Sequence, residues 1–438
     1  MKSKEGKRCT TSLAQSRHVL GILFLIFGGL FSAVLIVEMA LRVAGISERN
    51  PFILDSSVGW VHRPSIAGYA REEGGAYWRI NSEGWRDREH TKEKPNDTIR
   101  IAILGNSYAE ALNIPLENTF GAIMEHELQQ CPTLNDEHVE TLNFGVASYN
   151  TAQDLITLRD RVWDYSPDVV VLIFGAANDV ENNSKVLAEE RLRPFFAVHN
   201  DKLVLDTSFR ETSVFRFRTS SLAYRGYYFL RDHLGTVQVL RRFINTAKAR
   251  KARPAENPSQ ELGLDDAVFR EPKPTDIAWQ QAWEITDKLL IAMRNEVRAR
   301  GAYFMVVSLG TGVQDNPDPS IREVLMRQLG VDNLSYPDRR LKSLGDREHF
   351  QVLNLAPAFQ AYAIQRKAYL HGSGKSRGLG HWNVDGHHLA GTMIAQALCK
   401  GMEDGPIHGA LKRQADTAAT YPGTTTHKPV GDGHEVHP

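Results

Sequence analysis

Four short segments of this sequence carry the residue types that nucleophilic catalysis by a serine requires. A serine hydroxyl reacts slowly by itself, so it needs a base that takes its proton and hydrogen-bond donors that stabilise the oxyanion formed on the substrate. The segments are Gly105-Asn106-Ser107, Gly145, Gly175-Ala176-Ala177-Asn178-Asp179 and His381. If the four segments meet in space, we expect them to transfer acyl groups through a serine ester.

Each of the first three segments follows a run of residues that is typical of a β-strand. The runs cover residues 98–104, 139–144 and 168–174. Ser107 lies three residues after the first run, Gly145 directly follows the second, and Asn178 lies four residues after the third. Ligands bind beyond the carboxyl ends of the strands in open parallel sheets. We therefore expect these residues, with His381 just before the last helix, to converge on one edge of a sheet.

The pattern between and after these strands favours an α/β fold. The third run is continuously apolar, which is typical of a strand buried on both faces of a parallel sheet. Helices are predicted at 119–130, 151–165, 277–300, 320–329 and 386–398, and further strands at 302–308 and 350–355. Strands separated by helices predict a three-layer α/β/α fold with a parallel sheet of about five strands.

The four segments resemble the signature blocks of the SGNH (GDSL) hydrolase family, which are named for Ser, Gly, Asn and His. The family's Gly-Asp-Ser reads Gly105-Asn106-Ser107 here, and its Gly-x-Asn-Asp has one extra residue in 175–179. Upstream, residues 80–87 (Ile-Asn-Ser-Glu-Gly-Trp-Arg-Asp) resemble a membrane-tethered bacterial branch of the family. The resemblance spans roughly residues 55 to 400 and implies a flavodoxin-like fold.

The resemblance also implies a role for each residue. Ser107 is the nucleophile and His381 the general base, while the Ser107 amide, the Gly145 amide and the Asn178 side chain form the oxyanion hole. Supporting residues are expected at Asn106, Asp179 and Asp385. The implied activity is that of a serine esterase acting on O-acyl groups, such as acetyl, of an envelope or exported polysaccharide. Two alternatives are an O-acyltransferase that modifies a glycan and a retired hydrolase fold that binds glycans or acts as a scaffold.

The sequence departs from the family at the acid that should orient the histidine. The family places an aspartate two or three residues before this histidine, where this chain has Leu379 and Gly378. Loss of that acid costs about 10⁴ in rate in a serine triad. Three explanations remain: another carboxylate such as Asp346 or Asp385 supplies the function, Ser107 and His381 act as a dyad, or the site has decayed. Asn106 also replaces the family's aspartate.

The N-terminus predicts a membrane anchor. Residues 19–37 form a charge-free run rich in Leu, Ile, Phe and Val, about 28 Å long as a helix and enough to cross a bilayer core of about 30 Å. Basic residues predominate before it, so residues 1–18 should stay in the cytoplasm and the rest lie outside, in the periplasm of a bacterium. No clear cleavage site follows, which favours an uncleaved anchor over 19–41 rather than a signal peptide.

The rest of the chain divides by composition. We expect a segment over 45–97 that wraps the folded body, a hydrolase-like domain over 98–403 with an insertion at 180–275, and a disordered tail over 404–438. Within the insertion, the proline-rich and charged stretch 248–276 is expected to be a mobile loop. Cys131 and Cys399 would face an oxidising compartment, where either a disulfide or two buried thiols is expected.

Composition and motifs narrow the function classes. Lysine plus arginine and aspartate plus glutamate both number 52, so no basic excess points to nucleic acid. His381, His387 and His388 have no His-Glu-x-x-His spacing or cysteine ligand beside them, so neither a metal nor another cofactor is expected. The expected partners are the membrane and an ester substrate, and the sequence indicates no oligomeric state.

Overall fold

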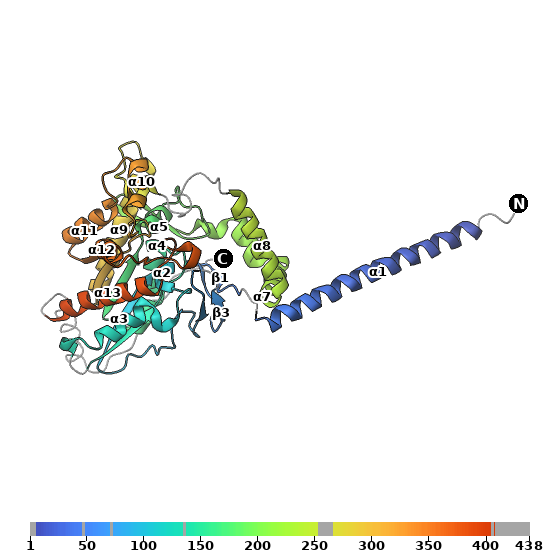
Figure 1. Ribbon diagram of the computed structural model, residues 1–438, viewed down its shortest axis with the longest axis horizontal. Coiled ribbons are helices and arrows are strands. Elements are labelled where there is room, and N and C mark those ends of the chain that lie inside the picture. The colour runs from blue at the N-terminus through green and yellow to red at the C-terminus, as the bar shows by residue number, and fades with distance from the viewer. Residues whose placement is uncertain are drawn as a thin grey trace, which may run out of the picture.

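A five-stranded parallel sheet forms the centre of the protein (Figure 1). The computed structural model describes residues 6–45, 49–70, 73–134, 137–252, 266–403 and 407. The strands lie in the order β11-β10-β7-β5-β6 and are β5 (Thr98–Gly105), β6 (His138–Asn143), β7 (Val169–Phe174), β10 (Tyr303–Ser308) and β11 (Gln351–Asn354). Numbered along the chain, this order is the 2-1-3-4-5 arrangement of flavodoxin-like folds. The predicted α/β fold is confirmed.

Helices cover both faces of the sheet because successive strand residues point to opposite sides. In β7, Val170, Leu172 and Phe174 pack in the core on one face, and Val169, Val171 and Ile173 in the core on the other. The first core is closed by α4 (Thr151–Asp160), α9 (Ile277–Ala299), α10 (Pro319–Leu329) and α11 (Tyr336–Glu348). The second is closed by α3 (Phe120–Leu128), α12 (Ala356–Arg366) and α13 (Val384–Glu403).

Each predicted strand and helix of the sheet region has a counterpart within a few residues, but α11 and α12 were not predicted. The α11 sequence carries seven charged side chains among thirteen residues and only a thin apolar stripe, so its pattern resembles a loop. Leu341 and Leu344 supply that stripe and are fully buried against the sheet. Packing of this narrow amphipathic face against the sheet stabilises the helix.

The N-terminal helix α1 (Gly6–Val43) projects away from the body (Figure 1). Its segment Leu20–Val43 is long and apolar enough to cross a membrane, and the most apolar stretch of this segment is not buried inside the protein. Exposing this many apolar side chains to water costs free energy. The helix is therefore a candidate membrane span, with the length that the sequence predicts.

The segment between α1 and β5 forms two antiparallel hairpins against the body. They are β1 (Phe52–Asp55) with β2 (Gly59–His62) and β3 (Ala67–Ala70) with β4 (Ala76–Arg79). Trp60 Nε1 donates to the Ala147 carbonyl at 3.1 Å, and Gln153 Nε2 donates to the Val58 carbonyl at 2.6 Å. These bonds tie the segment to the loop after β6 and to the start of α4.

The region 180–275 contains more regular structure than its sequence indicated. It holds the end of α5 (Ala176–Asn183), the hairpin β8 (Phe195–His199) with β9 (Lys202–Asp206), and three helices. The helices are α6 (Ser213–Ser220), α7 (Leu222–His233) and α8 (Gly235–Ala252). Residues 253–265, the middle of the stretch expected to be mobile, lie outside the described residues, and Asp266–Phe269 forms a 3-10 turn.

A disulfide joins Cys131 and Cys399 across 268 residues. It links the segment after α3 to the end of α13, two helices that pack side by side on one face of the sheet. Of the two alternatives for these cysteines, the structure has the disulfide. The tail predicted over 404–438 lies outside the described residues except for Ile407, which is buried.

Candidate active site

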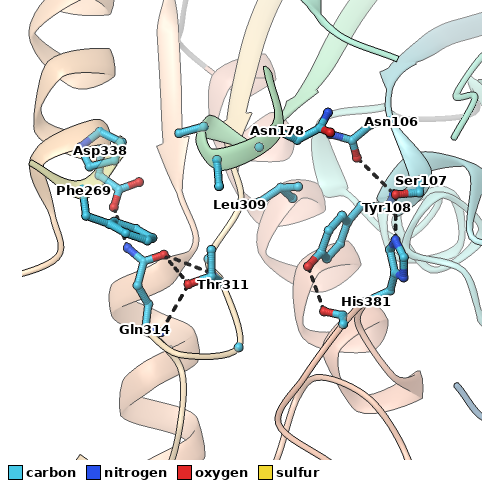
Figure 2. A pocket seen from close by; sticks show the side chains of 17 residues that line it. Asn106, Ser107, Tyr108, Asn178, Phe269, Leu309, Thr311, Gln314, Asp338 and His381 are labelled. Carbon is cyan, nitrogen blue, oxygen red and sulfur yellow. Dashed lines mark hydrogen bonds between the residues drawn. The ribbon is translucent and has the colours of Figure 1, made fainter. Parts of the chain in front are cut away.

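A cavity of about 200 Å³ opens at the carboxyl edge of the sheet, between the ends of β5 and β7. This is the place where the strand order reverses, and ligands bind at such points in open α/β sheets. Ser107, Asn178 and His381 all line the cavity (Figure 2). The structure thus brings together three of the four segments that the sequence singled out.

Ser107 and His381 are hydrogen-bonded, with Ser107 Oγ 2.7 Å from His381 Nε2 (Figure 2). Ser107 is the first residue of the short helix α2 (Ser107–Glu110), which follows β5. Asn106 caps this helix because its Oδ1 accepts from the Tyr108 amide at 3.1 Å. The strand, the cap and the helix fix the direction of the hydroxyl. This distance suits proton transfer from the hydroxyl to the imidazole.

The second ring nitrogen of His381 contacts a carboxylate that the sequence did not indicate. Glu73, on the turn between β3 and β4, has Oε2 at 2.7 Å from His381 Nδ1 and accepts from the His381 amide at 3.3 Å. Partial burial of Glu73 opposes its ionisation, but the hydrogen bond and charge of His381 outweigh it and lower the pKa of Glu73 below 4.5. Ser107, His381 and Glu73 form a continuous hydrogen-bonded chain.

Glycine before His381 allows this approach. Gly380 has φ +76°, a left-handed conformation that favours glycine, and a Cβ on it would collide with Glu73 Oε1. The positions where the resembled family has its aspartate are Gly378 and Leu379, so the chain lacks the acid there and leaves room for Glu73. No pattern near residue 73 in the sequence points to this role.

Two further side chains hold the Gly380 carbonyl and therefore the loop that carries His381. The Tyr108 hydroxyl donates to it at 3.0 Å (Figure 2), and His371 Nδ1 lies 2.9 Å away. Burial raises the pKa of Tyr108, so its hydroxyl remains a donor. His371 Nε2 is 3.1 Å from Asp315 Oδ2, and both side chains are 1% exposed. Burial raises the pKa of Asp315 to about 6, although His371 opposes the shift.

The expected oxyanion donors are only partly at the cavity. Asn178 lines it, with one amide hydrogen donated to the Tyr149 carbonyl at 3.0 Å and the other available. The Ser107 amide is at the first position of α2, where a backbone N–H has no acceptor within the helix. Gly145 is not among the residues that line the cavity, and its amide donates to Asn143 Oδ1 at 2.9 Å. The structure therefore places Ser107 and Asn178, but not Gly145, among the residues that line the cavity.

Gly145 lies behind the helix that carries the serine. A Cβ on Gly145 would lie 2.5 Å from the Ala109 Cβ and 2.8 Å from the Glu110 amide nitrogen. Its lack of a side chain lets the loop after β6 pack against α2. In the structure this glycine is closely packed against α2, behind Ser107.

Asn106 and Asp179 meet beneath the cavity. Asp179 Oδ2 accepts from the Gly175 amide at 2.8 Å and from Asn106 Nδ2 at 3.4 Å, and Oδ1 accepts from Thr151 Oγ1 at 3.2 Å. Burial raises the pKa of Asp179 to about 7, against the hydrogen bonds that lower it. Asp154, also buried, has its pKa raised by burial and by the charge of Asp179. An amide at position 106 avoids adding a third carboxylate to this pair.

The two carboxylates considered as substitutes lie elsewhere. Asp346 forms an ion pair with Lys342 on the exposed side of α11. Asp385 is exposed in the first turn of α13, and the described contacts of His381 do not include it. Neither residue is among the described hydrogen-bond partners of His381, whose ring nitrogens contact Glu73 and Ser107.

The neighbouring histidines do not form a metal site. His387 is buried, with its Nδ1 accepting from the Phe120 amide at 3.2 Å, and burial lowers its pKa to about 3. His388 is exposed. Among the described residues, no three His, Cys, Asp or Glu side chains are arranged to hold a metal ion.

The far wall of the cavity is formed by the segments after β10 and by the end of the insertion. Apolar contacts come from Leu309 and Phe269, and polar groups from Thr311, Gln314 and Asp338 (Figure 2). Gln314 Nε2 donates to Asp338 Oδ2 at 3.2 Å, and Ser308 Oγ donates to Asp338 Oδ1 at 2.7 Å. The far wall of the cavity therefore combines apolar contacts with hydrogen-bonded polar groups.

Comparison with known proteins gives distant structural similarity. No family model matches the sequence, and no curated protein matches it. An acetyl xylan esterase is 12% identical with a TM-score of 0.36, and the match covers 68% of this chain and 100% of that one. A lipase/acylhydrolase from Enterococcus faecalis is 14% identical with a TM-score of 0.33, covering 69% and 96%.

A third solved structure, an acetylxylan esterase from Geobacillus stearothermophilus, is 12% identical with a TM-score of 0.33, and the match covers 70% of this chain and 94% of that one. Identities and TM-scores at this level do not transfer an activity. The functional argument therefore depends on the geometry of Ser107, His381 and Glu73.

Proposed function

We propose that this chain is a membrane-tethered, extracytoplasmic serine esterase of the SGNH type. The observation that carries the proposal is the hydrogen-bonded chain from Ser107 Oγ through His381 to Glu73, with both links at 2.7 Å. A hydroxyl, an imidazole and a carboxylate in this order form the arrangement that activates serine nucleophiles on several unrelated folds. It opens into a cavity that can hold an ester.

In the proposed reaction, Ser107 Oγ attacks the carbonyl carbon of the ester while His381 Nε2 takes the hydroxyl proton. Glu73 accepts the Nδ1 proton in a hydrogen bond, which fixes the tautomer and stabilises the imidazolium. His381 then donates its proton to the leaving alcohol as the acyl–serine ester forms. In the second half of the reaction, a water molecule attacks the acyl–serine ester while His381 takes its proton. His381 then returns this proton to Ser107 Oγ, which releases the acid and regenerates the free serine.

The negative charge on the carbonyl oxygen would be stabilised by the Ser107 amide and the free amide hydrogen of Asn178. Removing one donor of this kind typically costs about 3 kcal/mol of transition-state stabilisation. The Gly145 amide is not part of the proposed oxyanion hole because it donates to Asn143 Oδ1. The proposed oxyanion hole therefore has two donors.

The size and lining of the cavity favour a small acyl group. At about 200 Å³, with Leu309 and Phe269 on its apolar side, it suits a short chain such as acetyl better than a fatty acyl chain. The polar rim at Gln314 and Asp338 would contact a hydroxylated alcohol portion. The family resemblance is the basis for proposing an envelope or exported polysaccharide as the substrate that carries the acyl group.

The location follows from the N-terminal helix and the disulfide. In the proposed topology α1 spans the membrane with residues 1–18 in the cytoplasm. The Cys131–Cys399 bond supports an oxidising compartment for the body, since disulfides are rare in the cytoplasm. Alkaline phosphatase fused to the C-terminus should be active, and an inactive but intact fusion would contradict this topology.

A fluorophosphonate probe tests the nucleophile. We expect the full-length protein to be labelled and to hydrolyse p-nitrophenyl acetate, and Ser107→Ala to lose both properties. Ser343→Ala, which changes an exposed serine on α11, is the matched control and should retain them. Absence of labelling in folded wild-type protein would favour the glycan-binding or scaffold alternative.

Hydrolysis and transfer can be separated with the same acyl-enzyme. In the acyltransferase alternative, a sugar hydroxyl rather than water attacks the serine ester. With an acetyl donor and an added oligosaccharide acceptor, we expect free acetate as the main product. Acetylated sugar as the main product would replace the esterase proposal with the transferase.

A further inference from the structure

The insertion contains two helices whose outward faces are apolar. On α7, Leu222 is 81% exposed and Phe229 61%, and on α8, Leu240 is 58% and Phe243 72% exposed. Along α8, these residues and Ile244 recur at spacings of three and four and therefore share one side of the helix. Large apolar side chains that gather on an exposed helix face mark an interaction site.

The opposite side of the same helices carries buried polar groups, which join the two helices to each other and to the N-terminal segment. Arg231 and Gln238 are buried, and Gln238 Nε2 donates to the Arg231 carbonyl at 2.9 Å. Asp232 is held by Arg63 of the N-terminal segment at 2.6 Å. A helix on the surface of a water-soluble protein has the reverse arrangement, with its apolar face inward. The outward face of α7 and α8 therefore requires an apolar environment.

The junction of the two helices is fixed to the end of α1. Glu38 accepts from the amides of Gly235 and Thr236 at 3.1 and 3.0 Å, and Arg42 Nη2 donates to the His233 carbonyl at 3.0 Å. The charge-free run of α1 ends one residue before Glu38. The start of α8 thus lies at the level where α1 would leave the hydrocarbon. Figure 1 shows α7 and α8 running across the end of α1, on the side of the body that faces it.

We propose that α7 and α8 lie in the outer surface of the membrane that α1 spans, with their apolar faces among the acyl chains just below the headgroups. An amphipathic helix that binds a bilayer surface has this combination of an apolar face and arginine-rich polar positions. The inference depends on the proposed anchor but not on the proposed chemistry. It assigns the insertion a second membrane contact that holds the body against the bilayer.

The charges around these helices favour anionic lipid. The stretch 213–247 contains six arginines and one acidic residue, Asp232. Behind α8 lies a cavity of about 480 Å³ with Arg49, Arg231, Arg241 and Arg242 among its lining residues; none of the lining residues that the structure describes is acidic. Arginine near a bilayer surface is attracted to anionic headgroups. The occupant of the surface is therefore an acidic phospholipid rather than a soluble protein.

Site-specific quenching in nanodiscs tests this arrangement. The full chain with Cys9→Ser carries one added cysteine labelled with the fluorophore NBD, and the nanodiscs contain phosphatidylcholine, phosphatidylglycerol and a lipid with a nitroxide near its headgroup. Phe243→Cys is the test position on α8. Ile364→Cys, half-exposed on α12, is the matched control, and Leu25→Cys on α1 reports the anchor.

We expect quenching at positions 25 and 243 that is about twofold or more above that at 364. Quenching at 25 with position 243 equal to 364 would overturn this inference and leave the anchor intact. No quenching at 25 would overturn the anchor together with the inference. Protection of position 243 from aqueous iodide without lipid quenching would assign the surface to a second copy or another protein.

The lipid class is tested by omitting phosphatidylglycerol. Weaker quenching at position 243, with that at 25 unchanged, is the expected result. Equal quenching in neutral lipid would overturn the preference for acidic headgroups. Leu240→Cys repeats the measurement one turn away, so a folding defect of one variant does not decide the outcome.

Discussion

Glu73 lies 2.7 Å from His381 although 308 residues separate them in the chain. The carboxylate comes from a hairpin turn that precedes the parallel sheet, and the imidazole from the loop before the last helix. The N-terminal segment therefore does more than cover the body, because it supplies a side chain to the candidate site. Glu73 supplies the carboxylate that is missing at Leu379, and this absence had favoured a retired site.

Replacing Glu73 should reduce esterase activity strongly. Glu73→Gln keeps the shape but removes the charge that fixes the His381 tautomer, so we expect kcat to fall by about 10³-fold or more, with KM little changed. Steady-state hydrolysis of p-nitrophenyl acetate measures this. Asp385→Asn and Asp346→Asn are the matched controls and should retain wild-type rates. Equal activity of Glu73→Gln and wild type would reduce the site to a dyad.

Asp179 should make stability depend on pH. Burial raises its pKa to about 7 from 3.8, so the folded state binds the proton more tightly than the unfolded state does. Its contribution to the free energy of unfolding therefore falls as pH rises from about 4 to 7 and is then constant. Asp179→Asn removes this titration.

Denaturant unfolding of wild type and Asp179→Asn at several pH values provides the measurement. We expect the variant's free energy of unfolding to rise relative to wild type between pH 4 and pH 7. A difference between the two proteins that stays constant over this range would contradict the assigned shift.

Gly145 should tolerate no side chain. Gly145→Ala places a methyl group 2.5 Å from the Ala109 Cβ, which should cost about 1–3 kcal/mol and shift α2, lowering activity through Ser107. Gly226→Ala on α7, where no atom lies within 4 Å, is the control and should be neutral or slightly stabilising. Thermal unfolding and esterase rates measure these two effects. Wild-type stability and activity in Gly145→Ala would contradict the prediction.

The disulfide should contribute substantially to stability. Cys131 and Cys399 close a loop of 268 residues, and a long loop loses much entropy in the unfolded chain when it is cross-linked, so its removal should cost about 2–5 kcal/mol. In a Cys9→Ser background, Cys131→Ser, Cys399→Ser and the double variant should lose similar stability. Additive losses in the double variant would show that the two residues act independently.

Several elements were predictable from local pattern. The apolar run before Gly175 has to be a buried strand, and Ser107 and Asn178 have to follow strand ends in a parallel sheet, so their convergence required no knowledge of distant contacts. The charge-free run before Glu38 likewise predicted a helix of membrane-spanning length.

The amphipathic faces of α7 and α8 were harder to recognise. Their apolar residues alternate with arginines and tyrosines, and only the burial of Arg231 and Gln238 and the ion pair of Asp232 with Arg63 establish which face points outward.

The sequence by itself predicted the five strands of the sheet, most of the helices around it, a helix of membrane-spanning length and the candidate serine, asparagine and histidine, because each depends on residues within a few positions of one another. The tertiary structure alone decided that Glu73 reaches His381, that Gly145 packs behind α2, and that Cys131 meets Cys399. The reason is physical: side chains from distant segments meet only where the packing of whole elements brings them, and local periodicity carries no information about that distance.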